Sequence, residues 1–66
     1  MRIDRISLNV AMARSDVSMR ELEKLSGVNY ATISFIRNGK SCREETAQRI
    51  AKALNVRMDE LVAKEG

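Results

Sequence analysis

Several residue types are missing from this sequence or nearly so, and each absence excludes a class of protein. The 66 residues contain no His and a single Cys, which excludes a zinc finger, His-dependent catalysis and an internal disulfide. Proline is also absent, so helix ends must be read from capping residues and glycines. No apolar run approaches the roughly 18 residues of a membrane span, and residues 1–13 lack the apolar core of a secretion signal. These absences predict a cytoplasmic protein without metal or disulfide.

Aromatic residues are scarce as well, and this limits how the chain can build a core. One Tyr, one Phe and no Trp leave a core of Ile, Leu, Val, Met and Ala, while 44% of all residues are apolar. A chain of about 60 residues buries roughly 60% of the surface that it exposes when unfolded. The composition therefore predicts one small helical domain over residues 1–66 and argues against an enzyme with a deep pocket.

Capping signals predict where the helices begin and end. Ser18 and Glu21 have the spacing of a capping box, and Gly27 is suited to end the helix that the box begins. Asn29 is a favourable N-cap for the next helix, which Gly39 follows. Five helices are predicted, at about residues 4–14, 19–26, 30–38, 42–54 and 58–63, and the tail 64–66 is expected to fray.

Apolar spacing predicts how these helices are buried. The first helix carries two apolar stripes, which predicts burial over a wide face. The stripes are Ile6, Val10 and Ala13, and Leu8, Ala11 and Met12. The fourth helix has apolar residues at positions 47, 50, 51 and 54, and a second capping box is predicted from Ser41 to Glu44. Leu61 and Val62 of the fifth helix are expected to close the core.

The net charge of +3 is unevenly distributed along the chain. The stretch from Lys24 to Arg43 contains four basic residues and no acidic residue, whereas the rest of the chain has a balance of −1. This stretch coincides with a predicted helix, tight turn and helix. A helix about 10–12 Å across fits the roughly 12 Å wide major groove of DNA, and the helix N-termini at Met19 and Cys42 are suited to hold phosphates. The pattern favours double-stranded DNA as the partner over a merely solvated charged face.

The order and spacing of several motifs resemble the helix-turn-helix regulators of the lambdoid phage repressor and Cro type, also called Xre-type regulators. The resemblance extends from about Leu8 to Val62. It rests on Ser18-Met19-Arg20-Glu21-Leu22, Ser26-Gly27-Val28-Asn29, Ala31-Thr32-Ile33-Ser34, Arg37-Asn38-Gly39-Lys40 and the stretch from Glu45 to Val56. It implies an all-α, five-helix lambda-repressor-like domain with a central helix-turn-helix.

The resemblance also implies which residues meet DNA, with the third helix as the recognition helix. Those expected to face base edges are Tyr30, Ala31, Ser34 and Phe35. Those expected to contact the DNA backbone are Ser18, Met19, Asn29, Thr32, Arg37, Asn38, Lys40 and Arg43. The positions implied to be buried are Leu22, Val28, Ile33, Ile36, Ile50, Leu54 and Leu61. No catalytic residue, cofactor, metal or small-molecule ligand is implied.

Three positions depart from the family pattern. Met19 replaces a Gln that usually binds phosphate, so only its backbone amide is left for that contact. Glu23 replaces a small Ala, so either the helix crossing opens or the Glu side chain bends outward. Arg37 stands where some relatives have a Glu that pairs with an Arg at the position of Met12, and that pair cannot form here. We expect Arg37 to pack near Met12 and to turn its guanidinium toward phosphate.

The base-facing set is unusually apolar. Tyr30, Ala31 and Phe35 cannot make the bidentate contacts of Arg with guanine or of Gln with adenine. Two interpretations remain open for Tyr30 and Phe35, namely burial in the core and contact with thymine methyl groups. The second interpretation predicts an operator that contains thymine.

The main hypothesis from these observations is a sequence-specific regulator of transcription, in particular a repressor. Two alternatives remain, an antitoxin that also neutralises a toxin and a protein-interaction module that never contacts bases. A two-fold homodimer would set the recognition helices about 34 Å apart, one turn of DNA. The residues that either build this dimer or belong to the core are Val56, Met58, Leu61 and Val62.

The remaining motifs argue against an enzyme. Gly39-Lys40-Ser41 is similar to the end of a phosphate-binding loop, but Ser34 stands where that loop requires a Gly. Glu44 and Glu45 point about 100° apart on a helix, so they cannot flank one substrate. Cys42 lies among basic residues, which favour a lowered thiol pKa, but a lone half-buried thiol is interpreted as inert.

Overall fold

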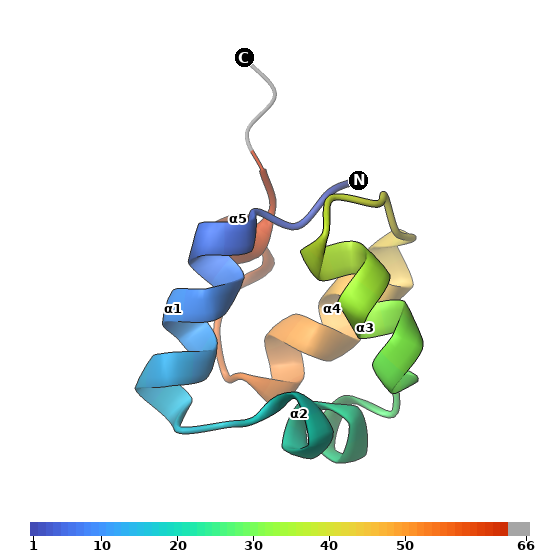
Figure 1. Ribbon diagram of the computed structural model, residues 1–66. Coiled ribbons are helices and arrows are strands. Elements are labelled where there is room, and N and C mark those ends of the chain that lie inside the picture. Colours follow the sequence, from blue (N-terminus) through green and yellow to red (C-terminus); the bar gives the residue numbers. More distant parts are fainter. Residues whose placement is uncertain (64–66) are drawn as a thin grey trace.

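The structure is a computed structural model that describes residues 1–63. These residues form five helices joined by turns (Figure 1). They are α1 (Arg5–Ser15), α2 (Met19–Ser26), α3 (Tyr30–Arg37), α4 (Glu44–Ala53) and α5 (Met58–Leu61). Residues 1–63 contain no strand, and the tail 64–66, expected to fray, lies outside the described residues. The prediction of an all-α fold with five helices is confirmed.

The first two helices begin at side chains that cap them. The Asp4 carboxylate accepts hydrogen bonds from the Ser7 amide at 2.9 Å and the Ser7 hydroxyl at 2.7 Å, and these bonds lower the pKa of Asp4 from its ordinary value of 3.8. Ser18 Oγ accepts from the Glu21 amide at 3.1 Å, while Glu21 Oε1 accepts from the Ser18 amide at 3.2 Å. The capping box predicted at Ser18 is confirmed.

The turn between α2 and α3 is only three residues long, 27–29. Gly27 has a φ of 74°, a left-handed conformation that strains residues with a Cβ atom. The buried hydroxyl of Ser26 donates to the Leu22 carbonyl at 2.6 Å and accepts from the Val28 amide at 3.1 Å. Val28 itself is buried. These contacts satisfy the polar groups of the turn and hold α3 against α2.

The fourth helix starts two residues later than predicted, because the segment before it pairs with the N-terminus. The Cys42 amide donates to the Met1 carbonyl at 2.7 Å, and the Met1 ammonium group donates to the Cys42 carbonyl at 3.0 Å. Arg43 is the N-cap residue of α4 and makes no side-chain capping bond. The capping box predicted from Ser41 is therefore wrong. Burial raises the pKa of the Cys42 thiol and outweighs the lowering effect of the nearby N-terminal charge, so the net lowering expected from basic surroundings is not observed.

The fifth helix is a single turn that ends before residue 63, because the chain leaves it to pair with the N-terminal segment. Val62 is extended and forms an antiparallel bridge with Ile3. Two backbone hydrogen bonds flank the bridge, from Asp4 to Leu61 at 2.7 Å and from Ala63 to Arg2 at 2.9 Å. Residues from both ends of the described chain therefore lie side by side (Figure 1).

A single hydrophobic core lies between the helices. In it α2 packs against α3 and α4, and α5 packs against α1 and α4. The largest fully buried side chains are Leu8, Leu22, Ile33, Ile36, Ile50, Leu54 and Leu61. Together with Val28 they confirm every position that the resemblance implies to be buried. Val62, by contrast, is only half-buried.

The first helix is buried on one stripe only. Its buried residues are Leu8, Ala11 and Met12, whereas Ile6 is 73% exposed and Val10 is also exposed. The predicted burial over a wide face is therefore wrong. The single turn of α5 packs on α1 without covering this outer stripe. Ile6 and Val10 line a groove of about 360 Å³ between α1 and the C-terminal segment.

Candidate nucleic-acid interface

The third helix separates its buried side chains from its exposed ones. Ile33 and Ile36 point into the core, whereas Tyr30 is 36% exposed and Phe35 is 54% exposed. Burial in the core was one of two interpretations for Tyr30 and Phe35, and that interpretation is wrong. Both aromatic rings of residues 1–63 are thus exposed on one helix, where they leave apolar surface in water and give up the stabilisation of burial. The outer face of α3 is therefore the first place to look for a binding surface.

A cation lies over each of the two aromatic rings of α3. Arg20 Cζ is 4.5 Å from the centroid of the Tyr30 ring, and Lys40 Nζ is 5.0 Å from the centroid of the Phe35 ring. Such cation–π contacts contribute about 0.5–1 kcal/mol at exposed sites. Arg20 belongs to α2 and Lys40 follows the end of α3, so positive charge is held beside both ends of the exposed face.

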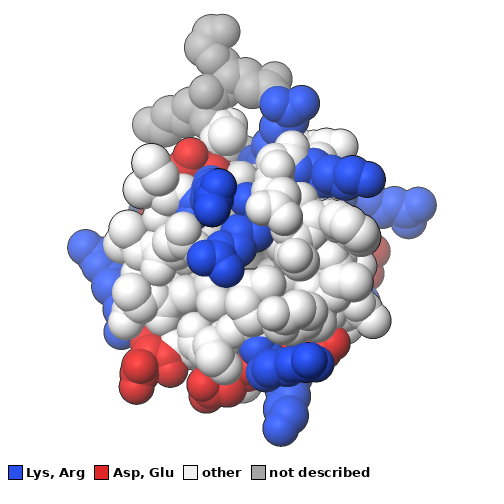
Figure 2. Space-filling model, viewed as in Figure 1, with Lys and Arg blue, Asp and Glu red and all other residues white. Residues whose placement is uncertain are grey.

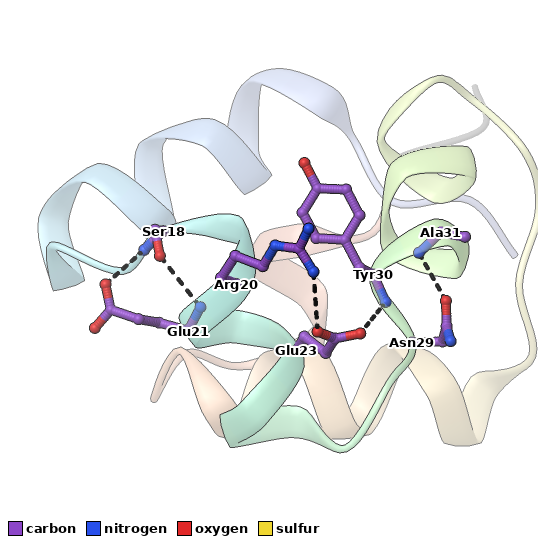
Figure 3. A network of polar contacts seen from close by, with 7 residues as sticks. All are labelled: Ser18, Arg20, Glu21, Glu23, Asn29, Tyr30 and Ala31. Atoms are coloured by element: carbon purple, nitrogen blue, oxygen red, sulfur yellow. Dashed lines mark hydrogen bonds and ion pairs between the residues drawn. The ribbon is translucent and has the colours of Figure 1, made fainter.

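Glu23 connects the first residue of α3 to α2 (Figure 3). Its Oε2 atom accepts a hydrogen bond from the Tyr30 amide at 2.7 Å, and its Oε1 atom lies 3.9 Å from Arg20 Nη1. Of the two expectations for Glu23, the outward bend is the one observed, since its carboxylate reaches an exposed backbone group. Asn29 Oδ1 accepts from the Ala31 amide at 2.8 Å. Side chains therefore occupy the first two amides of α3.

The N-terminus of α2 differs, because it keeps amides available for an anion. Ser18 accepts from the Glu21 amide, while the amides of Met19 and Arg20 have no hydrogen-bond acceptor among residues 1–63. The Met19 side chain is half-buried and packs against the core. The first turn of α4 carries two glutamates and that of α2 carries one, Glu21, so less negative charge opposes a phosphate at α2. The α2 terminus is therefore the better site for a phosphate.

Most of the residues expected to contact DNA lie on the surface. Those that are exposed are Ser18, Asn29, Tyr30, Ala31, Thr32, Phe35, Asn38, Lys40 and Arg43. Those that are half-buried are Met19, Ser34 and Arg37. The structure places Lys40 over the Phe35 ring and Arg43 at the N-cap of α4.

Arg37 is the last residue of α3, and its side chain is half-buried. Its Nε atom is buried and has no hydrogen-bond partner among the described residues. Within residues 1–63 it forms no ion pair with Glu21 or Glu23, both of which hold other partners. The expected contact of Arg37 with phosphate stays a prediction.

Arg20, and the contact of Glu23 with the Tyr30 amide, are two features of this surface that the sequence analysis did not identify. The charge pattern did not identify Arg20, because Glu21 and Glu23 follow it in the sequence. Arg20 therefore lies outside the acid-free stretch that begins at Lys24. A usable signal exists, since a long carboxylate one turn before the end of a helix can reach across a three-residue turn. By that signal Glu23 would be assigned to the amide of Tyr30.

The space-filling view shows how charge is distributed around this face (Figure 2). A broad uncharged area covers the lower middle of the view, a group of Lys and Arg side chains lies in the upper middle, others lie at the sides and the bottom, and acidic side chains lie mostly toward the edges. Duplex DNA offers a matching surface, because phosphates flank grooves whose floor includes apolar thymine methyl groups.

A comparison with protein families matches residues 7–64 to the Cro/C1-type HTH DNA-binding domain. The match begins within α1 and extends past α5. Comparisons with curated proteins and with solved structures gave no match. None of the helices in residues 1–63 has the length and hydrophobicity needed to cross a membrane. The same residues contain no cluster of three or more His, Cys, Asp or Glu side chains that could hold a metal ion.

Proposed function

The chain belongs to the Cro/C1-type HTH DNA-binding domain family, and we propose that it is a sequence-specific regulator of transcription that reads DNA with α3. In this proposal α3 enters the major groove, and Tyr30, Ala31, Ser34 and Phe35 face the base edges. Phe35 and Tyr30 contact thymine methyl groups, and the Tyr30 hydroxyl adds one hydrogen bond to a base or phosphate.

The observation that carries this proposal is the pairing of exposed aromatic rings with cations on α3. Phe35 is 54% exposed and lies under Lys40, so an apolar group and a positive charge face solvent together. A protein core cannot use that combination, whereas a DNA groove lined by phosphates can. The two buried isoleucines on the opposite side of α3 keep this face turned outward.

Contacts with the DNA backbone come from groups at the ends of the helices. The free amides of Met19 and Arg20 bind one phosphate at the N-terminus of α2. Lys40, Arg43 and Arg37 supply positive charge near further phosphates, while the other residues of the backbone set supply polar groups. Each neutralised phosphate releases counterions, so the logarithm of the affinity falls with the logarithm of the salt concentration.

Selection of bound DNA from a random duplex pool tests the proposal. We expect an enriched consensus with thymine at strongly specified positions, and affinity that falls steeply as salt is raised. Phe35→Ala should weaken binding to the consensus about tenfold, whereas Leu25→Ala, which also removes an exposed apolar side chain, should leave it unchanged. The absence of binding at about 50 mM salt, where non-specific contacts are strong, would contradict the proposal.

Repression is the regulatory outcome that we propose. A protein bound across a promoter excludes RNA polymerase, and binding alone is enough for this effect. Transcription in vitro from a promoter that overlaps the selected site should fall as protein is added. Increased transcription from that template would instead indicate an activator.

We also propose that two copies bind DNA together and meet at the groove between α1 and α5. Leu61, one of the residues considered for a dimer, is buried in the core, and Val56 and Met58 are half-buried against it. The exposed apolar side chains are instead Ile6 and Val10 on α1. This surface is the better candidate because it is open.

Charge at the groove supports a second copy as its occupant. Arg14 of α1 and Glu60 of α5 both line the groove, and a two-fold axis places each of them opposite the other residue of the partner. Ile6→Asp should abolish cooperative binding to two half-sites about 34 Å apart while a single half-site is still bound. Arg14→Glu should have the same effect, and adding Glu60→Arg should restore cooperativity. A monomer on every selected site would contradict the dimer.

A further inference from the structure

Arg20 contacts two other residues (Figure 3). Its guanidinium lies 4.5 Å from the centroid of the Tyr30 ring, and its Nη1 atom lies 3.9 Å from Glu23 Oε1. Glu23 is itself fixed by the amide of Tyr30, at 2.7 Å from Oε2. The side chains of Arg20 and Glu23 and both the ring and the backbone amide of Tyr30 therefore form a closed set of contacts that joins α2 to the start of α3.

The Arg20 side chain is 76% exposed, although two partners hold it. A guanidinium has five N–H donors in one plane, and the Nη1 nitrogen of Arg20 faces Glu23 at 3.9 Å, an ion-pair distance longer than a hydrogen bond. The remaining donors face away from Glu23, beside the exposed ring of Tyr30. A long side chain with fixed orientation and free donors loses less conformational entropy when it binds than a side chain that is free to rotate.

We propose that Arg20, held in place by Glu23 and Tyr30, reads a guanine in the major groove next to the bases read by α3. The inference rests on the proposed function, because it assigns one base contact within that interface. Arg is the side chain that most often recognises guanine, through a bidentate contact with O6 and N7. The outer face of α3 offers only Tyr30, Ala31, Ser34 and Phe35, none of which can make that contact. Arg20 supplies it from α2.

Glu23 acts as a positioning residue in this arrangement. Its carboxylate occupies the Tyr30 amide, which would otherwise be open to a phosphate, and it holds the Arg20 plane against the Tyr30 ring. Because it is negatively charged and close to the interface, Glu23 itself opposes non-specific binding to DNA. Replacing Glu23 should therefore lower the preference for guanine without lowering the non-specific affinity for DNA.

The test compares selected consensus sequences and affinities for wild-type protein and three variants. Arg20→Lys keeps the positive charge but has neither the planar fork nor the stacking surface, so preference for guanine at one position should fall about tenfold. Its non-specific affinity and salt dependence should stay as in wild type. Arg20→Ala should lose the same preference and leave the salt dependence close to that of wild type, because Arg20 contacts a base and not a phosphate in this proposal.

Glu23→Gln gives the complementary result, since it removes the charge while keeping a hydrogen-bond acceptor for Tyr30. We expect a weaker preference for guanine at that same position, together with non-specific affinity equal to or higher than that of wild type. Arg49→Lys and Glu45→Gln, which alter an exposed pair on α4, are the matched controls and should preserve the consensus.

Two results would overturn the assignment. One is an unchanged consensus with Arg20→Lys, and the other is a loss of preference spread evenly over all positions, which indicates a structural role only. Thermal unfolding of each variant shows whether it folds. The inference fails separately from the proposed function, because wild-type protein that selects a consensus still supports DNA reading when Arg20→Lys has no effect. Failure of wild-type protein to bind DNA would contradict both.

Discussion

The Arg49–Glu45 pair of α4 and the Arg20–Glu23 pair of α2 are both exposed ion pairs, but they reach different parts of the molecule. In α4 the nitrogen and oxygen atoms are 3.0 Å apart, whereas in α2 they are 3.9 Å apart. The shorter pair lies within one helix, and its hydrogen bond joins only those two residues. The longer pair also reaches a second helix, because Glu23 accepts a hydrogen bond from the Tyr30 amide of α3.

This comparison shows that the distance within a surface ion pair is a poor guide to what the pair does. Exposed pairs contribute little to stability on average, since solvent and salt screen them. A third partner on another helix changes the role of the carboxylate, because it then fixes one helix relative to its neighbour. Contacts between helices should therefore matter more to stability than contacts within one helix.

The largest effect should come from an apolar contact between helices. Leu22 of α2 is fully buried, whereas Leu25 of the same helix is 60% exposed. Leu22→Ala should lower the free energy of unfolding by about 2–5 kcal/mol, because burial is lost and a cavity is left. Leu25→Ala should change it by about 0.5 kcal/mol or less. Urea unfolding followed by circular dichroism measures both, and equal losses would show that the rule does not hold for α2.

The buried hydroxyl of Ser26 provides the next test. Ser26→Ala leaves the Val28 amide without its hydrogen-bond acceptor in a buried turn, so the expected loss is about 1–3 kcal/mol. Ser41→Ala removes an exposed hydroxyl that caps no helix, and it should leave the stability unchanged. Equilibrium unfolding of the two variants under the same conditions distinguishes them. A comparable loss for Ser41 would mean that it caps α4 after all.

Glu23 and Glu45, the acidic members of the two ion pairs, should differ less in their effect on stability, but they test the comparison more directly. Glu23→Ala removes the acceptor of the Tyr30 amide at the start of α3, and the expected loss is about 0.5–2 kcal/mol, as for a helix cap. Glu45→Ala removes a pair within α4 and should cost about 0.5 kcal/mol or less. Thermal unfolding at low and high salt measures both. If the Glu45 variant is the less stable one, the shorter ion pair is the important one and the comparison is reversed.

Asp4 is a carboxylate whose hydrogen-bond partners are neutral. Its contribution to stability should be the smallest of those considered. Hydrogen bonds from Ser7 lower the pKa of Asp4 in the folded protein, so folding favours the ionised form. The stabilisation is present above the ordinary pKa of 3.8 and is lost as the pH falls through the lowered pKa. Asp4→Asn should flatten this part of the acid unfolding curve. An unchanged curve would show that Asp4 does not contribute to it.

Two similar sequence patterns show why the fold was predictable only in part. Ser18 and Ser41 are each followed by Glu three positions later, yet a capping box forms only at Ser18. At Ser41 the backbone of the next residue pairs with Met1, and a local pattern carries no information about a partner so distant in the chain. The two apolar stripes of α1 also look alike in sequence. Which stripe stays exposed depends on the position of α5, which is distant in the chain as well.

The candidate site was predictable where it depends on spacing within one helix. Spacing and resemblance placed α3 and its buried isoleucines, because helical periodicity alone determines which side chains share a face. The contacts of Glu23 with Tyr30 and Arg20 also depend on the angle between two helices. That angle is set by the turn at Gly27 and by the packing beneath it, which no local pattern of charge describes.

The bridge between Ile3 and Val62 has a consequence for the order in which the protein can fold during synthesis. The ribosome releases residues 2–4 well before residues 61–63, so the two segments that pair here become available at widely separated times. A nascent chain that has released only α1–α4 lacks Leu61, a fully buried part of the finished core. Closing so long a loop adds little thermodynamic cost, because the entropy lost grows only with the logarithm of loop length. The late appearance of residues 61–63 therefore affects the rate of folding and not the stability. The inner stripe of α1 stays open to other contacts until residues 61–63 have been translated.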